Sequence, residues 1–289
     1  MNKKITTHLS TADLVMSGLI QAAGPYTMKA DMEGSPFRAL ARAIAHQQLN
    51  GTAANTILTR FINTVGINGE FPTPQQVLDA PEATLRAAGF SFAKIASLRD
   101  LAAKTIEGVV PDRATLLTLS NDEILERLTQ VRGIGRWTVE MMLMFQLDRP
   151  DVLPVDDFGV RNGFRLAYGI RKMPHPKALA LFGERWAPYR TTAAWYLWRA
   201  VELHRAGTLP VPSEPTKLPR IPRLRRAVKR LKKKVSAKLA KAKKRVARVA
   251  ARVKTRVKPR VARAEPKAAT RTRSRVRAKA SPSSRARRS

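Results

Sequence analysis

The sequence predicts an all-α fold for most of the chain, followed by a C-terminal tail of a different kind. Apolar residues recur at intervals of three and four up to Gly207, with little of the alternation that is typical of strands. Helix-capping patterns separate these segments at short intervals. After Pro210 the composition changes abruptly, because Lys, Arg, Ala, Val, Pro, Ser and Thr dominate and aromatic residues are absent. These observations indicate a helical domain joined to a disordered extension.

Recognisable start and stop signals mark the predicted helices. Ser35 precedes a proline in the first helical turn, as a capping serine does. Thr73 and Gln76 have the spacing of a capping box, and Gly89 is a typical helix end. In chain order, the expected helices are 36–65, two short helices that open at Thr73 and Ala80, 92–107, 124–131, 137–146, one that opens near Asp157, 174–186 and 191–205.

The net charge of +34 belongs mainly to the tail. From Ser213 onward the chain has 31 of its 55 basic residues but only two of its 21 acidic ones. The first 212 residues therefore carry a net charge of only +5, and they are long enough to bury a full core. The tail cannot bury enough apolar surface to offset its ordering entropy, so we expect it to be disordered. Its positive charge predicts salt-sensitive DNA binding that ignores base sequence.

The composition also excludes several classes of site. The chain has no cysteine, which excludes disulfides, thiolate zinc sites and cysteine-ligated iron–sulfur clusters. Its four histidines are scattered and show no ligand spacing, so we expect no cofactor. No segment approaches the roughly 20 consecutive apolar residues of a membrane helix. We therefore expect a soluble, cytoplasmic protein that is monomeric and has no membrane partner.

A Gly-Ile-Gly turn lies between two apolar helical segments. Its two glycines permit a tight turn whose amides could face a phosphate beside the positive end of the following helix. Flanking arginines and a threonine hydroxyl strengthen this interpretation. The residues predicted to contact DNA are Arg132, Gly133, Ile134, Gly135, Arg136 and Thr138. A plain turn between two helices explains the glycines equally well, and this alternative stays open.

Two aspartates, Asp156 and Asp157, follow the turn by about twenty residues. Because they precede an apolar helical segment, one of them is expected to be only a helix cap. The other could place a carboxylate near the molecule whose phosphate the hairpin binds.

Taken together, these motifs resemble the helix-hairpin-helix DNA glycosylases. G-I-G-R-W-T followed by L-P-x-D-D is similar to the alkylation-repair branch, DNA-3-methyladenine glycosylase II. The segments 37–49 and 184–198 extend the resemblance. It implies a two-lobed helical domain over 34–207, with residues 1–33 as an extension that packs on it and 208–289 as the DNA-binding tail. The tail resembles linker-histone tails in composition only.

The resemblance implies a role for each matching position. Asp157 falls on the catalytic aspartate, and Asp156 takes the capping role. Bifunctional relatives carry a lysine nucleophile where this chain has Trp137, so no Schiff base can form and no lyase activity is expected. The implied enzyme is a monofunctional hydrolase that flips alkylated purines, 3-methyladenine first, out of double-stranded DNA.

Three further groups of residues follow from the resemblance. The base pocket would be formed by Trp137, Met141, Phe158 and Trp198. The side chain that fills the gap left by the flipped base would be Gln47, Gln48 or Leu49. Main-chain carbonyls that could hold a monovalent cation are those of Thr129, Val131 and Ile134. Ordinary core packing explains any single aromatic residue, and a polar helix end explains the glutamines.

Two rival functions stay open. The first is a glycosylase of other specificity, for uracil or hypoxanthine, because the sequence defines the shape of the pocket poorly. The second is a non-catalytic, nucleoid-associated or chromatin-type DNA-binding protein. Asp157 discriminates between an enzyme and a pure binder, since a binder has no need of that carboxylate.

Overall fold

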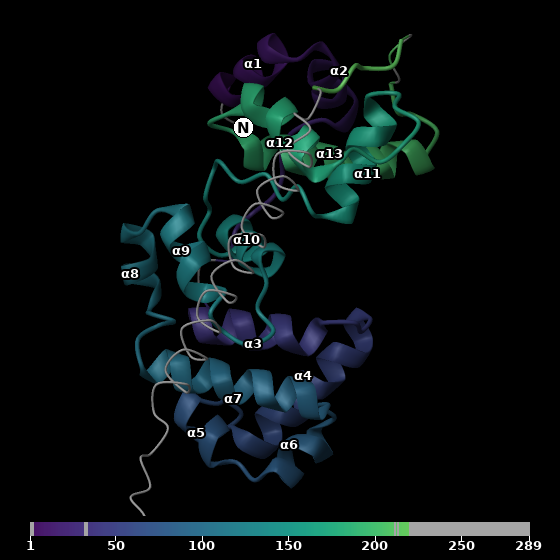
Figure 1. The fold of residues 1–289 in the computed structure, drawn as a ribbon. Coiled ribbons are helices and arrows are strands. Elements are labelled where there is room, and N and C mark those ends of the chain that lie inside the picture. Colours follow the sequence, from purple (N-terminus) through teal and green to yellow (C-terminus); the bar gives the residue numbers. More distant parts are fainter. Residues whose placement is uncertain (1–2, 32–33, 211, 213, 220–289) are drawn as a thin grey trace, which may run out of the picture. The chain divides into compact units, whose positions relative to one another are not determined.

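The computed structural model describes residues 3–31, 34–210, 212 and 214–219 (Figure 1). These residues belong to a unit that spans Met1–Ile221, whereas the second unit, Pro222–Ser289, lies outside the described residues. The tail that the sequence predicts therefore lies largely outside them as well. No strand occurs in the described part, which confirms the all-α prediction. In the same part, no helix has both the length and the apolar composition to cross a bilayer.

The helices fall into two lobes. The central lobe comprises α3 to α10, and the terminal lobe comprises α1, α2, α11, α12, η1 and α13. The bounds are α1 Lys3–Ala12, α2 Leu14–Ala23, α3 Pro36–His46, α4 Gly51–Val65, α5 Pro74–Asp79, α6 Glu82–Ala88, α7 Phe92–Ile106, α8 Arg113–Thr118, α9 Asn121–Leu128, α10 Arg136–Phe145, α11 Phe158–Ala167, α12 Pro176–Gly183, η1 Glu184–Trp186 and α13 Arg190–Arg205.

Local capping explains most helix starts. The Ser35 hydroxyl accepts a hydrogen bond from the backbone of Arg38, and Thr73 and Gln76 form both halves of a capping box. The periodic segment 36–65 forms two helices, because Asn50 caps a new helix at α4. Helix α8 was not predicted, and it begins at a cap formed by Asp112.

The terminal lobe contains both ends of the described chain. Helices α1 and α2 pack against η1 and α13. Beyond α13 the chain continues along the same lobe, where the backbone of Thr216 donates to the carbonyl of Tyr168 and Leu209 and Leu218 pack against the core. The described residues after 207 thus contact the helical domain, so the folded unit extends past the boundary that composition indicates.

Asp13 is a buried junction within this lobe. Its side chain is 7% exposed and caps α2 by accepting from two backbone amides, those of Val15 and Met16. Its Oδ2 atom also accepts from the Tyr168 hydroxyl at 2.8 Å and from Nε1 of Trp186 at 3.1 Å. One carboxylate thereby ties the N-terminal helices to the end of α11 and to η1.

We expect Asp13→Ala to lower the free energy of unfolding by about 3 kcal/mol, because it leaves a buried hydroxyl and a buried indole N–H unsatisfied. Urea denaturation followed by circular dichroism measures the loss. Asp112→Ala is the matched control, since Asp112 caps α8 on the surface and has no buried partner. Equal losses in the two variants would contradict the assignment of Asp13 as a buried junction.

Candidate active site

A tight turn over 129–135 joins α9 to α10 and forms the predicted hairpin. Gly133 has a φ of +77°, in the left-handed region that favours glycine. A Cβ atom there would also lie 2.7 Å from Oγ of Ser97, so the close approach to α7 favours glycine as well. Gly135 is the N-cap of α10 and supplies no side-chain acceptor. The first amides of α10 therefore have no side-chain cap, as an anion site requires.

Helix α7 holds the hairpin through polar contacts. The Asp100 carboxylate accepts from the backbone N–H of Arg132 at 2.6 Å and forms a salt bridge of 2.7 Å with Lys104. Lys104 also donates to the carbonyl of Gln130 at 2.7 Å. Partial burial acts to raise the pKa of Asp100, but these hydrogen bonds and charges lower it below its ordinary value. The hairpin backbone is therefore fixed to α7 at two of its residues.

The residues predicted to contact DNA divide into exposed and buried ones. Arg132 and Arg136 are exposed at the hairpin, beside the amide end of α10. Ile134 is 4% exposed, so it offers only its backbone. Thr138 is 8% exposed and lines a cavity, and its predicted contact with a phosphate stays a prediction.

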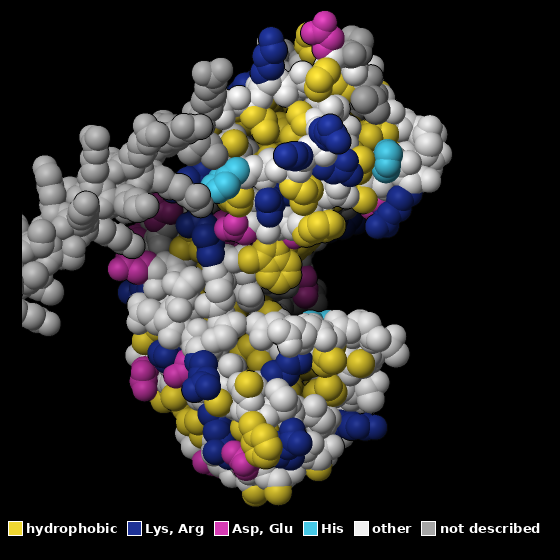
Figure 2. Space-filling view, turned by 45° about the vertical axis from the view of Figure 1, so that its right-hand side comes forward, with side chains coloured by type: hydrophobic (Ala, Val, Ile, Leu, Met, Phe, Trp, Pro, Cys, Tyr) yellow, Lys and Arg dark blue, Asp and Glu magenta, His cyan; other side chains and the backbone are white. Residues whose placement is uncertain are grey.

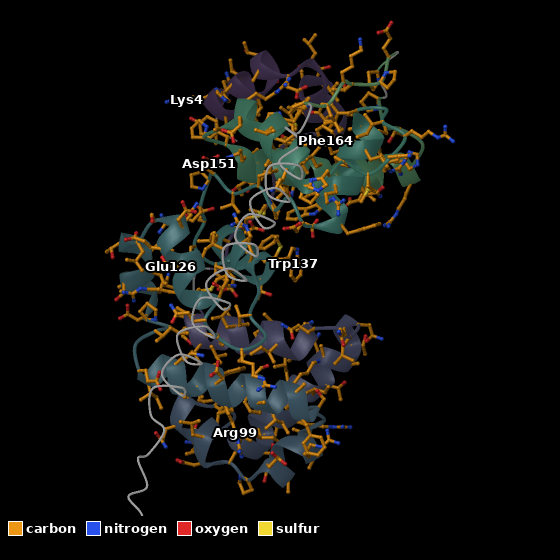
Figure 3. The ribbon with its side chains drawn as sticks, viewed as in Figure 1. Lys4, Arg99, Glu126, Trp137, Asp151 and Phe164 are labelled. Atoms are coloured by element: carbon orange, nitrogen blue, oxygen red, sulfur yellow. The ribbon has the colours of Figure 1, made fainter. Side chains whose placement is uncertain are left out.

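The Asp157 carboxylate lies at the start of α11 and accepts three hydrogen bonds. Its Oδ1 atom accepts from the backbone N–H of Val160 at 2.7 Å and from Nε1 of Trp198 at 2.8 Å. Its Oδ2 atom accepts from Nε1 of Trp137 at 3.0 Å. Figure 3 shows Trp137 projecting from α10 between the two lobes. Two indoles from different helices, α10 and α13, thus fix the orientation of one carboxylate.

The cap of α11 is Asp157 and not Asp156, which corrects the prediction. A capping side chain accepts from the amide three residues later, and that amide belongs to Val160. Asp156 is exposed in the preceding turn. The two roles that the sequence analysis divided between the aspartates therefore belong to one side chain.

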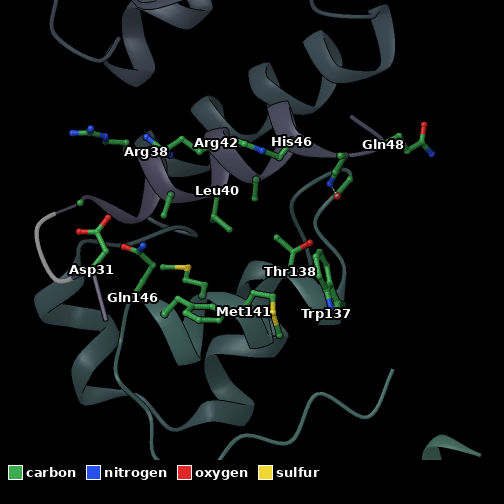
Figure 4. Close-up of a pocket in the computed structure, with 17 residues that line it drawn as sticks. Asp31, Arg38, Leu40, Arg42, His46, Gln48, Trp137, Thr138, Met141 and Gln146 are labelled. Atoms are coloured by element: carbon green, nitrogen blue, oxygen red, sulfur yellow. Dashed lines mark hydrogen bonds between the residues drawn. The ribbon is translucent and has the colours of Figure 1, made fainter. Parts of the chain in front are cut away.

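A cavity of about 630 Å³ opens between α3 and α10 (Figure 4). Its volume is in the range of ligand-binding pockets. Trp137, Met141 and Phe145 line it from α10. Asp157 does not line the cavity, but it accepts a hydrogen bond from Trp137, which does. In the space-filling view, the surface of the molecule is deeply hollowed on one side (Figure 2).

The four residues predicted to form a base pocket are placed differently. Trp137 and Met141 line the cavity, and Trp137 is 47% exposed. Trp198 lies behind them, stacked on Phe145 with ring centroids 5.8 Å apart and planes at 17°. Phe158 is 72% exposed and is not among the residues that line this cavity, so its part in a base pocket stays a prediction. It follows Asp157 directly at the first position of α11.

Sequence reasoning missed the polar wall of this cavity. Arg38, Arg42 and His46 recur at every fourth position of α3 and line the side opposite α10. Their spacing on an otherwise apolar helix was the signal that could have identified them. Asp31, Gln47, Gln48, Thr138 and Gln146 also belong to the polar part of the lining.

The connection between α3 and α4 contains the three candidates for the gap-filling residue. Gln47 donates from Nε2 to the carbonyl of Gly133 at 2.8 Å, which ties this connection to the hairpin. Gln48 has a φ of +58°, an unusual value for a residue with a side chain, and Leu49 is 40% exposed. Gln48 and Leu49 are therefore the more exposed pair beyond the end of α3.

The predicted cation site concerns the carbonyls of Thr129, Val131 and Ile134. The Val131 carbonyl accepts the amide of Ile134 at 3.0 Å, which closes the turn that carries all three. Within the described ranges, no cluster of His, Cys, Asp or Glu side chains could hold a metal ion. The cation at the hairpin stays a prediction.

Known proteins resemble this chain over most of its folded part. DNA-3-methyladenine glycosylase 1 of Schizosaccharomyces pombe is 44% identical over 209 residues, which are 70% of this chain and 91% of that protein. A structure of the Schizosaccharomyces pombe 3-methyladenine DNA glycosylase in complex with abasic DNA matches with a TM-score of 0.63 and covers 70% of this chain and 98% of that one. A crystal structure of a DNA-3-methyladenine glycosidase from Bacillus halodurans is 33% identical, with a TM-score of 0.65, and covers 71% of this chain and 92% of that one.

A family model described as HhH-GPD superfamily base excision DNA repair protein matches residues 41–188. This range extends from α3 through the hairpin and Asp157 to the end of η1. The chain therefore belongs to the HhH-GPD superfamily of base excision DNA repair proteins.

Proposed function

We propose that this protein is a monofunctional DNA glycosylase that hydrolyses the N-glycosidic bond of alkylated purines, 3-methyladenine first. One observation carries the proposal. The Asp157 carboxylate is held by two indole N–H groups, and one of these indoles lines a cavity of the size of a ligand pocket. The names of the relatives in Schizosaccharomyces pombe and Bacillus halodurans support alkylated purines as the substrate class.

The chemistry requires one negative charge in the right place. Breaking the N-glycosidic bond makes the sugar positive, and the Asp157 carboxylate stabilises that charge and orients the attacking water. An alkylated purine already carries positive charge, so it leaves without a dedicated acid. The exposed face of Trp137 stacks on the electron-poor base in a cation–π arrangement. Trp137 also replaces the lysine that a lyase needs, so the DNA strand stays intact.

The hairpin and the connection after α3 hold the DNA around the flipped nucleotide. The uncapped amides of α10, with Arg132 and Arg136 beside them, bind a phosphate. Gln48 or Leu49 fills the gap in the base stack, because Gln47 is engaged with the hairpin. The protein works as a monomer without a cofactor.

Incubation with methylated duplex DNA tests the proposed function. We expect free 3-methyladenine in the supernatant by chromatography, and no strand breaks until the abasic sites are cleaved chemically. Strand cleavage by the protein alone would contradict the monofunctional assignment. Release of uracil or hypoxanthine alone, from duplexes that carry them, would identify the other specificity. A protein that binds these duplexes and releases no base would be a DNA-binding protein only.

The basic tail is proposed to prolong residence on DNA and to associate the protein with the nucleoid. Deletion of residues 222–289 should flatten the dependence of log Kd on log salt concentration, because proteins with six to ten phosphate contacts lose about 10³- to 10⁵-fold in affinity between 50 and 200 mM salt. Binding titrations at several salt concentrations measure the slope. Single-turnover base release at saturating enzyme should remain nearly unchanged. Loss of base release under those conditions would show that the tail takes part in the reaction itself.

A further inference from the structure

A buried carboxyl group lies on α10 next to the candidate active site. Glu140 is 2% exposed, and its Oε1 atom accepts from Nε of Arg136 at 2.8 Å. Its other oxygen, Oε2, is buried and has no hydrogen-bond partner among the residues that the structure describes. A half-satisfied buried carboxylate destabilises a fold, and an amide or apolar side chain of similar size would fill the space at lower cost. Packing alone therefore does not explain Glu140.

The surroundings of Glu140 connect it to the catalytic carboxylate. Trp137, which binds Asp157, precedes Glu140 by one helical turn on α10. Burial raises the pKa of Glu140, the Arg136 guanidinium opposes this rise, and the charges of Asp156 and Asp157 add to it. These interactions place Glu140 within electrostatic reach of both aspartates, with one cation, Arg136, acting on it from the hairpin side.

We propose that Glu140 is a positioning residue whose charge adds negative potential at the place where the sugar becomes positive. Arg136 controls how far this charge is compensated. In the free protein, Arg136 neutralises Glu140 through their salt bridge. When the hairpin binds DNA, a phosphate shares the exposed guanidinium, and the Glu140 charge is less compensated. The site around Asp157 then becomes more negative only when DNA is present. This inference rests on the proposed glycosylase function.

The sign of the stability effect separates this role from a structural one. Because burial raises the pKa of Glu140 in the folded protein, its ionised form costs folding free energy above the pKa of the unfolded chain. Glu140→Gln keeps the size and an acceptor oxygen for Arg136 but removes the charge. The variant should therefore melt at the same temperature as the wild type or higher. A structural role predicts a lower melting temperature.

The test compares full-length wild type with Glu140→Gln in two measurements. Single-turnover release of 3-methyladenine from methylated duplex DNA, at saturating enzyme, should fall about five- to twentyfold, since each tenfold corresponds to about 1.4 kcal/mol of transition-state stabilisation. Affinity for an abasic-site duplex should stay equal or become tighter, because a negative charge near the phosphates has been removed. A slower reaction with unweakened binding is a result that a folding defect does not produce.

Asp151→Asn is the matched control. It breaks the salt bridge of 2.6 Å between Asp151 and Arg190, which is partly buried and outside the cavity lining. Its rate of base release should equal that of the wild type. An unchanged rate in Glu140→Gln, or a parallel loss of rate, affinity and melting temperature, would overturn the role of Glu140 alone. A wild type that releases no base would overturn the proposed function and this inference with it.

Discussion

Replacing Asp157 by Asn is expected to slow base release about a thousandfold while affinity for abasic-site DNA changes little. The reason is electrostatic, because a neutral amide cannot stabilise the positive sugar of the transition state, and removal of one well-placed stabilising group typically costs 10²- to 10³-fold. Single-turnover kinetics on methylated duplex DNA measure the rate. A fluorescence titration with an abasic-site duplex measures the affinity.

Asn is the informative substitution because Asp157 also caps α11. Asn and Asp are about equally good N-caps, so the bond to the backbone of Val160 survives and α11 is retained. Asp157→Ala would remove the cap and the charge together. Asp156→Asn is the control, since it removes an exposed carboxylate one residue away and should leave the rate within a few-fold of wild type. Full activity in Asp157→Asn would end the catalytic assignment.

Features of this fold that depend on neighbouring residues could be predicted from the sequence. The capping box at Thr73 and Gln76 and the cap at Ser35 are contacts within one turn, so their sequence patterns suffice. One error arose where two neighbouring residues were equally able to cap. Asp156 and Asp157 are chemically identical, and only the backbone geometry of the turn decides which one accepts from Val160.

Features that depend on distant residues could not be predicted. The indole N–H groups of Trp137 and Trp198 meet on Asp157 across 20 and 41 positions of sequence, and no local pattern encodes that meeting. The same limit applies to Glu140. On the sequence it is a polar residue in a mainly apolar helix, and only the folded structure shows that the charges of Asp156 and Asp157 raise its pKa.

Trp137→Ala is expected to slow base release about a hundredfold, because Trp137 has two roles in the site. Its indole N–H donates to Oδ2 of Asp157 at 3.0 Å, and its ring lines the cavity beside Met141. The alanine variant removes the orienting hydrogen bond and the aromatic face together. Loss of a hydrogen bond to a charged group and of a cation–π contact would each contribute about 1 to 3 kcal/mol to the barrier.

Trp137→Phe separates the two roles. Phenylalanine keeps an aromatic face on the cavity but cannot donate to Asp157, so the maximal rate should fall about tenfold while the enzyme concentration for half-maximal rate stays close to wild type. In the alanine variant, the maximal rate should fall and the enzyme concentration for half-maximal rate should rise. Trp195→Phe is the matched control, because Trp195 packs edge-on against Tyr26 and Tyr196, away from Asp157. If Trp137→Phe reacts as fast as the wild type, the indole N–H does not orient the carboxylate during catalysis. Asp157 would then depend on Trp198 and the backbone of Val160 alone.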